Sequence, residues 1–191
     1  MYRTVRSIHL CAGLFALVFL VVYAVSALQM THGEWVHMQA RATTRDVTLP
    51  AGLPGARAAA RELALRYGIS GELTAIRVIP DGVAFRVLRP GMVWQADYLT
   101  ATGAMHLRIT DTGTVGALNR IHQMRGTWHT WVAYNLWAVL LAVVGCAIVT
   151  LGASGLYLWW KTHRDRRFTG ALVALAVAVS GCLAAWMRST G

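Results

Sequence analysis

The sequence predicts a membrane protein with three transmembrane α-helices and one small α+β domain between the first and second of them. Hydrophobic residues make up 56% of the chain, which is more than a soluble domain of this length usually has. The excess lies in three runs without a charged residue, at 10–28, 131–160 and 171–187. A helix needs about 20 mostly apolar residues to cross a bilayer. The first two runs are separated by about 100 residues, which is enough for one small domain.

The three runs differ in how well they fit a bilayer. The first matches the required length, and the second is longer than needed, so it is expected to tilt or to project from the membrane. The third is at the short end, and the alternative for it is a helix buried in a protein core. The first run is expected to be an uncleaved signal anchor, because it is longer than the apolar part of a signal peptide and no clear cleavage site follows it.

The ends of the runs predict the orientation. The stretch "GLYLWWKTHRDRR" at 155–167 passes from apolar residues through Trp159 and Trp160 into a basic cluster. Tryptophan gathers at the membrane surface, and Lys and Arg are enriched on the cytoplasmic side. Arg3 and Arg6 precede the first run and agree with that assignment. We therefore expect a bacterial inner-membrane protein with its N-terminus in the cytoplasm, its C-terminus outside and its main domain in the periplasm.

These signals divide the chain into five segments. Residues 1–31 are expected to form the cytoplasmic N-terminal end and the first span, and 32–128 an extracytoplasmic domain with its juxtamembrane segments. Residues 129–161 are expected to form the second span, 162–169 a cytoplasmic loop and 170–188 the third span.

The segment between the first two runs predicts a helix followed by strands. "GARAAARELALRY" at 55–67 lies between Pro54 and Gly68, which are helix start and stop signals. "VAFRVLR" at 83–89 alternates apolar and other residues, as a strand with one buried face does. Similar segments at 72–79, 92–100 and 104–110 are separated by turn residues. We expect one helix packed on an antiparallel meander of three or four strands.

The charge and the cysteines exclude several function classes. The net charge is +10, and 11 basic residues against seven acidic ones lie between Gln29 and Thr130. This excess suits anionic head groups or an anionic ligand, whereas scattered basic residues do not predict nucleic-acid binding. Cys11, Cys146 and Cys182 all lie in the apolar runs, so the domain between the runs cannot hold a disulfide framework or a cysteine metal site.

No catalytic motif is recognisable in the sequence. It contains no glycine-rich nucleotide loop and no pair of carboxylates at a spacing that predicts acid–base chemistry. The apolar runs contain no charged residue, which argues against an ion pump or transporter. We therefore assign no catalytic residue.

The order of the elements resembles a known family. The helix followed by "YGISGELTAIRVIPDGVAFRV" and "ADYLTATGAM" resembles the PepSY domain. "RSIHLCAGL", "IHQMRGTWHTW" and "GLYLWWKTHR" resemble the span ends of the PepSY-associated transmembrane (PepSY-TM) family. The likeness covers most of 6–167. Larger, reductase-type members have more spans, so the chain looks like a small single-unit member and their activity does not transfer as a whole.

The resemblance implies a b-type haem, because some members are haem-containing reductases of ferric siderophores. Six of the seven histidines lie near span ends, and neutral imidazole is a common ligand of haem iron. Apart from haem iron, no metal is expected. The candidate cofactor-binding residues are His9, His32, His37, His122, His129 and His163 as ligands, with Arg120 and Arg125 for the haem propionates.

The spacing suggests how these histidines pair. His122 and His129 are seven residues apart and are expected to share one face of a helix, where Gly126 would leave room for a flat macrocycle. His106 lies in the predicted sheet and is expected to face solvent. The outer pair would join His122 or His129 to His32 or His37, and the inner pair would be His9 with His163. The alternative is that the histidines are solvated or bonded to lipid head groups.

Two functions follow from these observations. The first is an inner-membrane haem-b electron-transfer protein or subunit that assists reduction of an extracytoplasmic metal chelate, in the manner of a ferric-siderophore reductase. The second is a non-enzymatic, membrane-anchored PepSY protein that binds a partner or serves as an accessory subunit of a larger complex. The expected partners are membrane lipid and a membrane protein or a second copy of the chain, with no nucleic acid.

Overall fold

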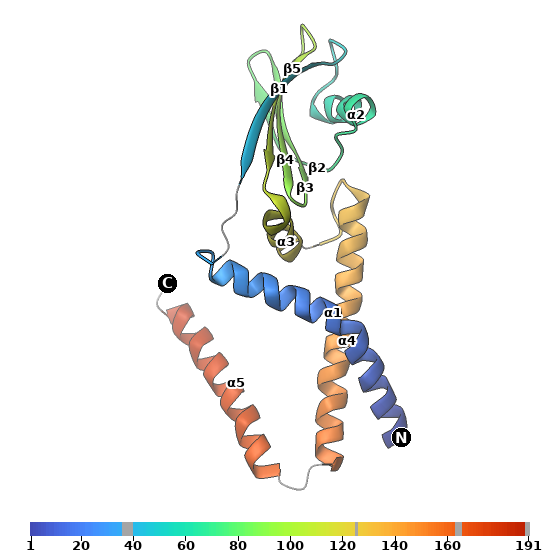
Figure 1. Cartoon of the computed structure of the whole chain (residues 1–191), viewed down its shortest axis with the longest axis vertical. Coiled ribbons are helices and arrows are strands. Elements are labelled where there is room, and N and C mark those ends of the chain that lie inside the picture. The colour runs from blue at the N-terminus through green and yellow to red at the C-terminus, as the bar shows by residue number, and fades with distance from the viewer. Residues whose placement is uncertain (36–39, 125, 163–165, 190–191) are drawn as a thin grey trace. The chain divides into compact units, whose positions relative to one another are not determined.

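The three apolar runs form three long helices. The computed structural model describes residues 1–35, 40–124, 126–162 and 166–189. The helices are α1 (Tyr2–Thr31), α4 (Val132–Thr162) and α5 (Arg166–Ser189) (Figure 1). Each is long and apolar enough to cross a membrane, and none of the most apolar part of α5 is buried inside the protein. The prediction of three spans is confirmed, and the chain is an integral membrane protein.

Between α1 and α4 lies a five-stranded antiparallel sheet with one helix on it. The strands follow the order β1-β5-β4-β3-β2 across the sheet. Figure 1 shows α2 (Ala56–Tyr67) beside this sheet. The strands are β1 (Arg41–Thr48), β2 (Glu72–Ile79), β3 (Gly82–Arg89), β4 (Met92–Leu99) and β5 (Ala104–Asp111). The predicted helix on an antiparallel sheet is confirmed, although the expected number of strands was too low.

Tight turns set the register of β2 to β5. β3 and β4 pair from Gly82↔Leu99 to Arg89↔Met92, and they are joined by Pro90 and Gly91. Gly91 has a φ of 82°, in the left-handed region that a side chain disfavours. The turn residues therefore fix which side chains of neighbouring strands stand next to each other.

The core lies between α2 and one face of the sheet. Ala59 and Leu63 of α2 are fully buried, and they pack with alternate residues of the strands, such as Phe85 and Tyr98. The Tyr98 hydroxyl donates to the carbonyl of Pro50 at 2.6 Å. A satisfied buried hydroxyl fits an otherwise apolar core, so this face of the sheet is occupied by packing.

The sequence did not predict two elements. β1 pairs with β5 along its whole length, but Val47 is its one buried residue, so it shows little alternation of apolar and polar residues. Helix α3 (Gly113–Gln123) follows β5 and has no buried residue. It starts where Thr112 donates from its backbone N–H to the carbonyl of Gly91 at 2.8 Å. Both elements are held by contacts with distant segments.

The chain forms two compact units. One contains residues 1–16 and 145–191, and the other contains residues 17–144. The second unit holds the sheet, α2, α3 and the adjoining parts of α1 and α4. In the first unit, the Nδ1 atom of His9 lies 2.9 Å from the Ser154 hydroxyl. A β-carbon at Gly155 would lie 3.3 Å from the His9 ring, so the glycine lets α1 and α4 approach at this point.

Substitution of Leu63 tests the packing of α2 on the sheet. Leu63→Ala should destabilise the sheet domain by about 2–5 kcal/mol, because it leaves a cavity in the core. Hydrogen exchange of β3 and β4 amides in the purified full-length chain should then accelerate more than tenfold. Leu65→Ala is the matched control, since Leu65 is on the same helix and 73% exposed. Equal effects of the two substitutions would contradict the packing described above.

Candidate functional site

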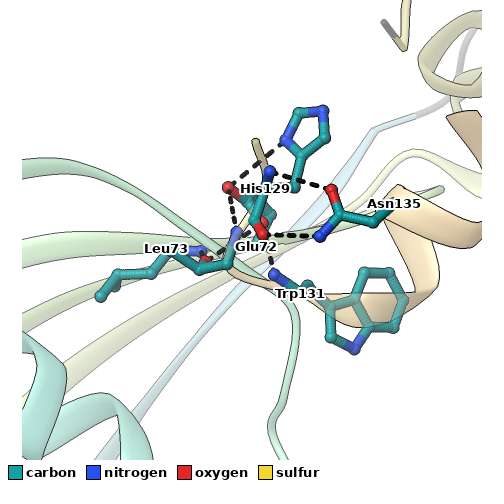
Figure 2. Close-up of polar contacts among 6 residues, drawn as sticks. Glu72, Leu73, His129, Trp131 and Asn135 are labelled. Atoms are coloured by element: carbon teal, nitrogen blue, oxygen red, sulfur yellow. Dashed lines mark hydrogen bonds and ion pairs between the residues drawn. The ribbon is translucent and has the colours of Figure 1, made fainter. Parts of the chain in front are cut away.

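A buried carboxylate joins the sheet to the second span. Glu72, the first residue of β2, is 7% exposed. It accepts hydrogen bonds from the backbone N–H groups of Thr130 at 3.2 Å and Trp131 at 2.8 Å, and from the Thr130 hydroxyl at 3.1 Å (Figure 2). A buried charge is costly unless it is hydrogen-bonded. The segment that precedes α4 therefore satisfies the Glu72 side chain.

Glu72 also satisfies the start of α4. The first N–H groups of a helix have no partner within the helix, and negative charge is favourable at that end. Trp131 immediately precedes Val132, the first residue of α4, and its N–H points at the Glu72 carboxylate. A side chain of the sheet thus caps a membrane helix that lies about 60 residues later in the chain.

His129 and Asn135 complete this contact. The Nδ1 atom of His129 lies 3.4 Å from a Glu72 oxygen. The His129 backbone N–H donates to the side-chain oxygen of Asn135 at 3.0 Å, and the Asn135 amide donates back to the His129 carbonyl at 2.9 Å. We call Glu72, His129, Thr130, Trp131 and Asn135 the Glu72 joint (Figure 2).

Two further contacts hold the sheet at the joint. The Leu73 backbone N–H donates to the Thr130 hydroxyl at 3.3 Å. The Arg89 guanidinium lies over the rings of Trp94 at 5.5 Å and Trp131 at 5.8 Å, within the range of cation–π attraction. The joint is thus anchored on both β2 and β3.

A cavity of about 330 Å³ lies beside the joint. This volume is at the lower end of the range for small-molecule sites. Tyr134, which is 2% exposed, has a buried hydroxyl close to Arg120. Such a group is normally satisfied by protein, water or ligand. The lining residues are Glu72, Thr74, Arg120, Gln123, Met124, Trp128, His129 and Tyr134.

The predicted arrangement of His122 and His129 on one helix face is wrong. His122 is in α3, which ends at Gln123, whereas His129 precedes α4, which begins at Val132. The backbone of Met124 is extended, with a φ of −69° and a ψ of 133°, so α3 does not continue toward His129. The two imidazoles also have different neighbours, because the Nδ1 atom of His122 lies 2.6 Å from the hydroxyl of Ser26 on α1.

The expected space at Gly126 is also absent. The indole ring of Trp128 occupies the position that a β-carbon of Gly126 would take. The glycine therefore accommodates a side chain of the same segment. The His122 ring lies against Tyr23 of α1, with 4.8 Å between ring centroids. His122 contributes to the packing of α3 on α1.

The remaining candidate residues lie in separate places. His9 contacts Ser154, which belongs to the same unit as His9, and His32 stacks on Trp35 at 4.0 Å between ring centroids. Arg120 lines the cavity beside His129. The predicted ligands His37 and His163 and the predicted propionate partner Arg125 lie outside the described residues. The assignment of haem ligands stays a prediction.

His106 is on the exposed face of the sheet, where its Nδ1 atom lies 2.6 Å from a carboxylate oxygen of Asp46. Among the residues that the structure describes, no group of three or more His, Cys, Asp or Glu side chains could hold a metal ion. The sequence did not indicate three residues of this site, namely Glu72, Tyr134 and Asn135. Each is a common residue type without a motif, and its role depends on contacts between distant segments.

The chain matches one family model over nearly its whole length. The match covers residues 1–187 and is to the family described as PepSY_TM-like. Comparisons with curated proteins and with solved structures gave no match. The family match covers the three long apolar helices and the sheet domain between the first two. The chain therefore belongs to the PepSY_TM-like family of membrane proteins.

Proposed function

We propose that the chain is a membrane-anchored binding protein whose sheet domain receives a ligand or partner and communicates with the second span. The Glu72 joint is the observation that carries this proposal. It connects the first residue of β2 to the start of α4 through a buried charge. Because breaking such a contact leaves a charge and several donors unpaired, the sheet and the helix are expected to move together.

The cavity beside the joint supports the same proposal. Its lining comes from β2, α3 and α4, through Thr74, Arg120 and Tyr134. A ligand in this position would contact all three elements at once. Binding would therefore favour one arrangement of the sheet relative to the helix, since a ligand shifts a protein toward the state that it binds better.

Spin-label distances test the coupling. We would replace the native cysteines and place labels at Asp81, in the β2–β3 turn, and at Leu136, on the exposed side of α4. The unsubstituted joint should give one narrow distance distribution, and Glu72→Ala should broaden it. The Glu72→Ala substitution should also accelerate hydrogen exchange of the Trp131 amide about 10- to 100-fold, because a hydrogen bond to a charged group contributes about 1.5–3 kcal/mol.

The matched control for that substitution is Glu62→Ala. Glu62 lies on α2 and pairs with Arg66 at 2.9 Å on the surface, so its loss removes a carboxylate from the same domain without changing the joint. A distance distribution that is already broad with Glu72 present would contradict the coupling. An unchanged distribution in Glu72→Ala would contradict it as well.

Haem binding is a second candidate, which one observation favours. The His129 imidazole has a carboxylate at Nδ1, as histidines that bind metal commonly have, and it lines a cavity with Arg120. In this candidate, His129 would supply a ligand and Arg120 would neutralise a propionate. A bound haem would carry single electrons. The family resemblance supplies this chemistry, and the second axial ligand has no assignment among the contacts described here.

A reduced-minus-oxidised absorption spectrum of the chain purified with haem supplied tests this candidate. If haem binds here, His129→Ala should remove or shift the Soret band, because the iron loses a strong ligand. His106→Ala should leave the band unchanged, since His106 is on the exposed face of the sheet. A wild-type protein without a Soret band would eliminate the candidate.

We also propose that the N-terminus and the loop between α4 and α5 are cytoplasmic, with the sheet domain in the periplasm. The basic residues Arg3, Arg6 and Lys161 at these helix ends support this orientation. A reporter that is active only outside the cytoplasm should be active when it is fused after Gly191. Activity there of a reporter restricted to the cytoplasm would contradict the orientation.

A further inference from the structure

The face of the sheet opposite α2 presents a row of hydrogen-bond donors. The register pairs Arg86 with Gln95 and Gln95 with Arg108, so these three side chains stand next to one another on adjacent strands. Thr74 pairs with Arg86 at one end of the row, and Thr44 pairs with Arg108 at the other. Hydroxyl, guanidinium and amide groups all donate hydrogen bonds. We call Thr44, Thr74, Arg86, Gln95 and Arg108 the donor row.

Four residues of the donor row, all except Thr74, line a surface cavity of about 510 Å³. All five strands contribute to its lining, which includes Arg77 in addition to Arg86 and Arg108. None of these three guanidinium groups forms an ion pair with a carboxylate of the described residues. Three guanidinium groups without an ion pair to the described carboxylates therefore line one cavity, together with the side chains of Asp46 and Asp97. Its size suits small molecules.

A β-bulge directs Arg77 toward this cavity. Thr74 pairs with Arg86 and Arg77 pairs with Ala84, so β2 has one residue more than β3 between these pairs. Side chains of a regular strand alternate between faces, and the extra residue places Thr74 and Arg77 on the same face. Ala75 in the bulge has a φ of 50°, a conformation that costs a non-glycine residue about 1–2 kcal/mol. Bulges often redirect a side chain at a functional site.

A second row on the same face supplies acceptors. Asp97 pairs with His106 in the register, and His106 contacts Asp46 at 2.6 Å. Residues two apart on a strand are separated by about 7 Å, which is the distance between the two rows. A ligand that bridges them would offer an anionic group to the arginines and a hydroxyl or amino group to Asp97.

We propose that this face binds a small anion with two or more carboxylate or phosphate groups. Arg86 and Arg108 lie two strands apart, or about 10 Å between Cα atoms, so one ligand with several anionic groups can reach both. Guanidinium groups bind carboxylate and phosphate through paired hydrogen bonds. The inference rests on the proposed binding function and names the class of ligand.

The position of the donor row relates ligand binding to the Glu72 joint. Thr74 belongs to the donor row and also lines the cavity beside the joint. It lies two residues after Glu72 on β2, on the same face of the strand. One end of the donor row therefore lies two residues from the carboxylate that connects the sheet to α4.

Calorimetric titration of the full-length chain in neutral lipid nanodiscs tests the proposal. The probes are citrate, tricarballylate, pyrophosphate and inorganic phosphate. Citrate and tricarballylate carry the same three carboxylates, and citrate has one hydroxyl more. We expect the polyanions to bind more tightly than inorganic phosphate. Arg86→Gln and Arg108→Gln should each weaken their binding at least tenfold, and added salt should do so as well.

The matched control is Arg61→Gln. Arg61 is exposed on α2, so this substitution removes the same charge from the other side of the sheet, and it should change the affinity less than twofold. Asp97→Asn should reduce any preference for citrate over tricarballylate. We expect unchanged melting temperatures for the Arg86 and Arg108 variants, because these side chains are exposed and form no ion pair with the described carboxylates. This result would exclude unfolding as the cause of weaker binding.

Several outcomes would overturn the inference. One is that no probe binds with a dissociation constant below about 10 mM. Another is that Arg61→Gln weakens binding as much as Arg86→Gln does. Loss of citrate binding in nanodiscs of anionic phosphatidylglycerol would assign the face to lipid head groups. The spin-label distances of the Glu72 variants are measured without any of these probes. Failure of the anion-binding inference is therefore distinguishable from failure of the proposed coupling.

Discussion

The buried Glu72 carboxylate holds the sheet domain to the start of the second span, and the rest of the structure at this point depends on that contact. A charge that is almost fully buried has to be satisfied by donors, and the donors here come from the segment directly before α4. The same contact provides an acceptor for N–H groups at the start of that helix. Each side therefore needs the other, and neither the first residue of β2 nor the first turn of α4 can move without leaving polar groups unpaired.

The two faces of the sheet differ in composition, because one packs against α2 and the other is open to solvent. The face toward α2 is filled by apolar side chains and Tyr98, which gives the domain its stability. The opposite face is polar, concave and lined by residues from all five strands. Glu72 lies on this face of β2, two residues before Thr74, so the face that is open to a ligand is also the face that contacts the segment before α4. A β-bulge at Ala75 places Arg77 on this surface.

The histidines illustrate how little a residue type says about chemistry without its neighbours. His9, His122 and His129 each have the Nδ1 atom close to a side-chain oxygen, from Ser154, Ser26 and Glu72 respectively. The first two contacts connect helices, and the third is part of the joint. The His129 contact is also compatible with metal ligation, since an oriented imidazole with a carboxylate neighbour is a common metal ligand. His129 therefore takes part in both candidate functions, and the reduced-minus-oxidised absorption spectrum distinguishes between them.

The sequence by itself determined the elements whose signals are local. Long apolar runs with aromatic and basic ends predicted the three spans, and alternation bounded by turn residues such as Pro90 and Gly91 predicted four of the five strands, because periodicity and turn chemistry reside within a few neighbouring residues. The tertiary structure alone decided the rest. β1 owes its place to pairing with β5, and Glu72 became a helix cap for a segment far along the chain. His122 contacts Ser26 of α1, whereas His129 contacts Glu72 of β2. Each of these depends on which distant segments meet, and hydrogen bonds between distant segments leave no periodic pattern in the sequence.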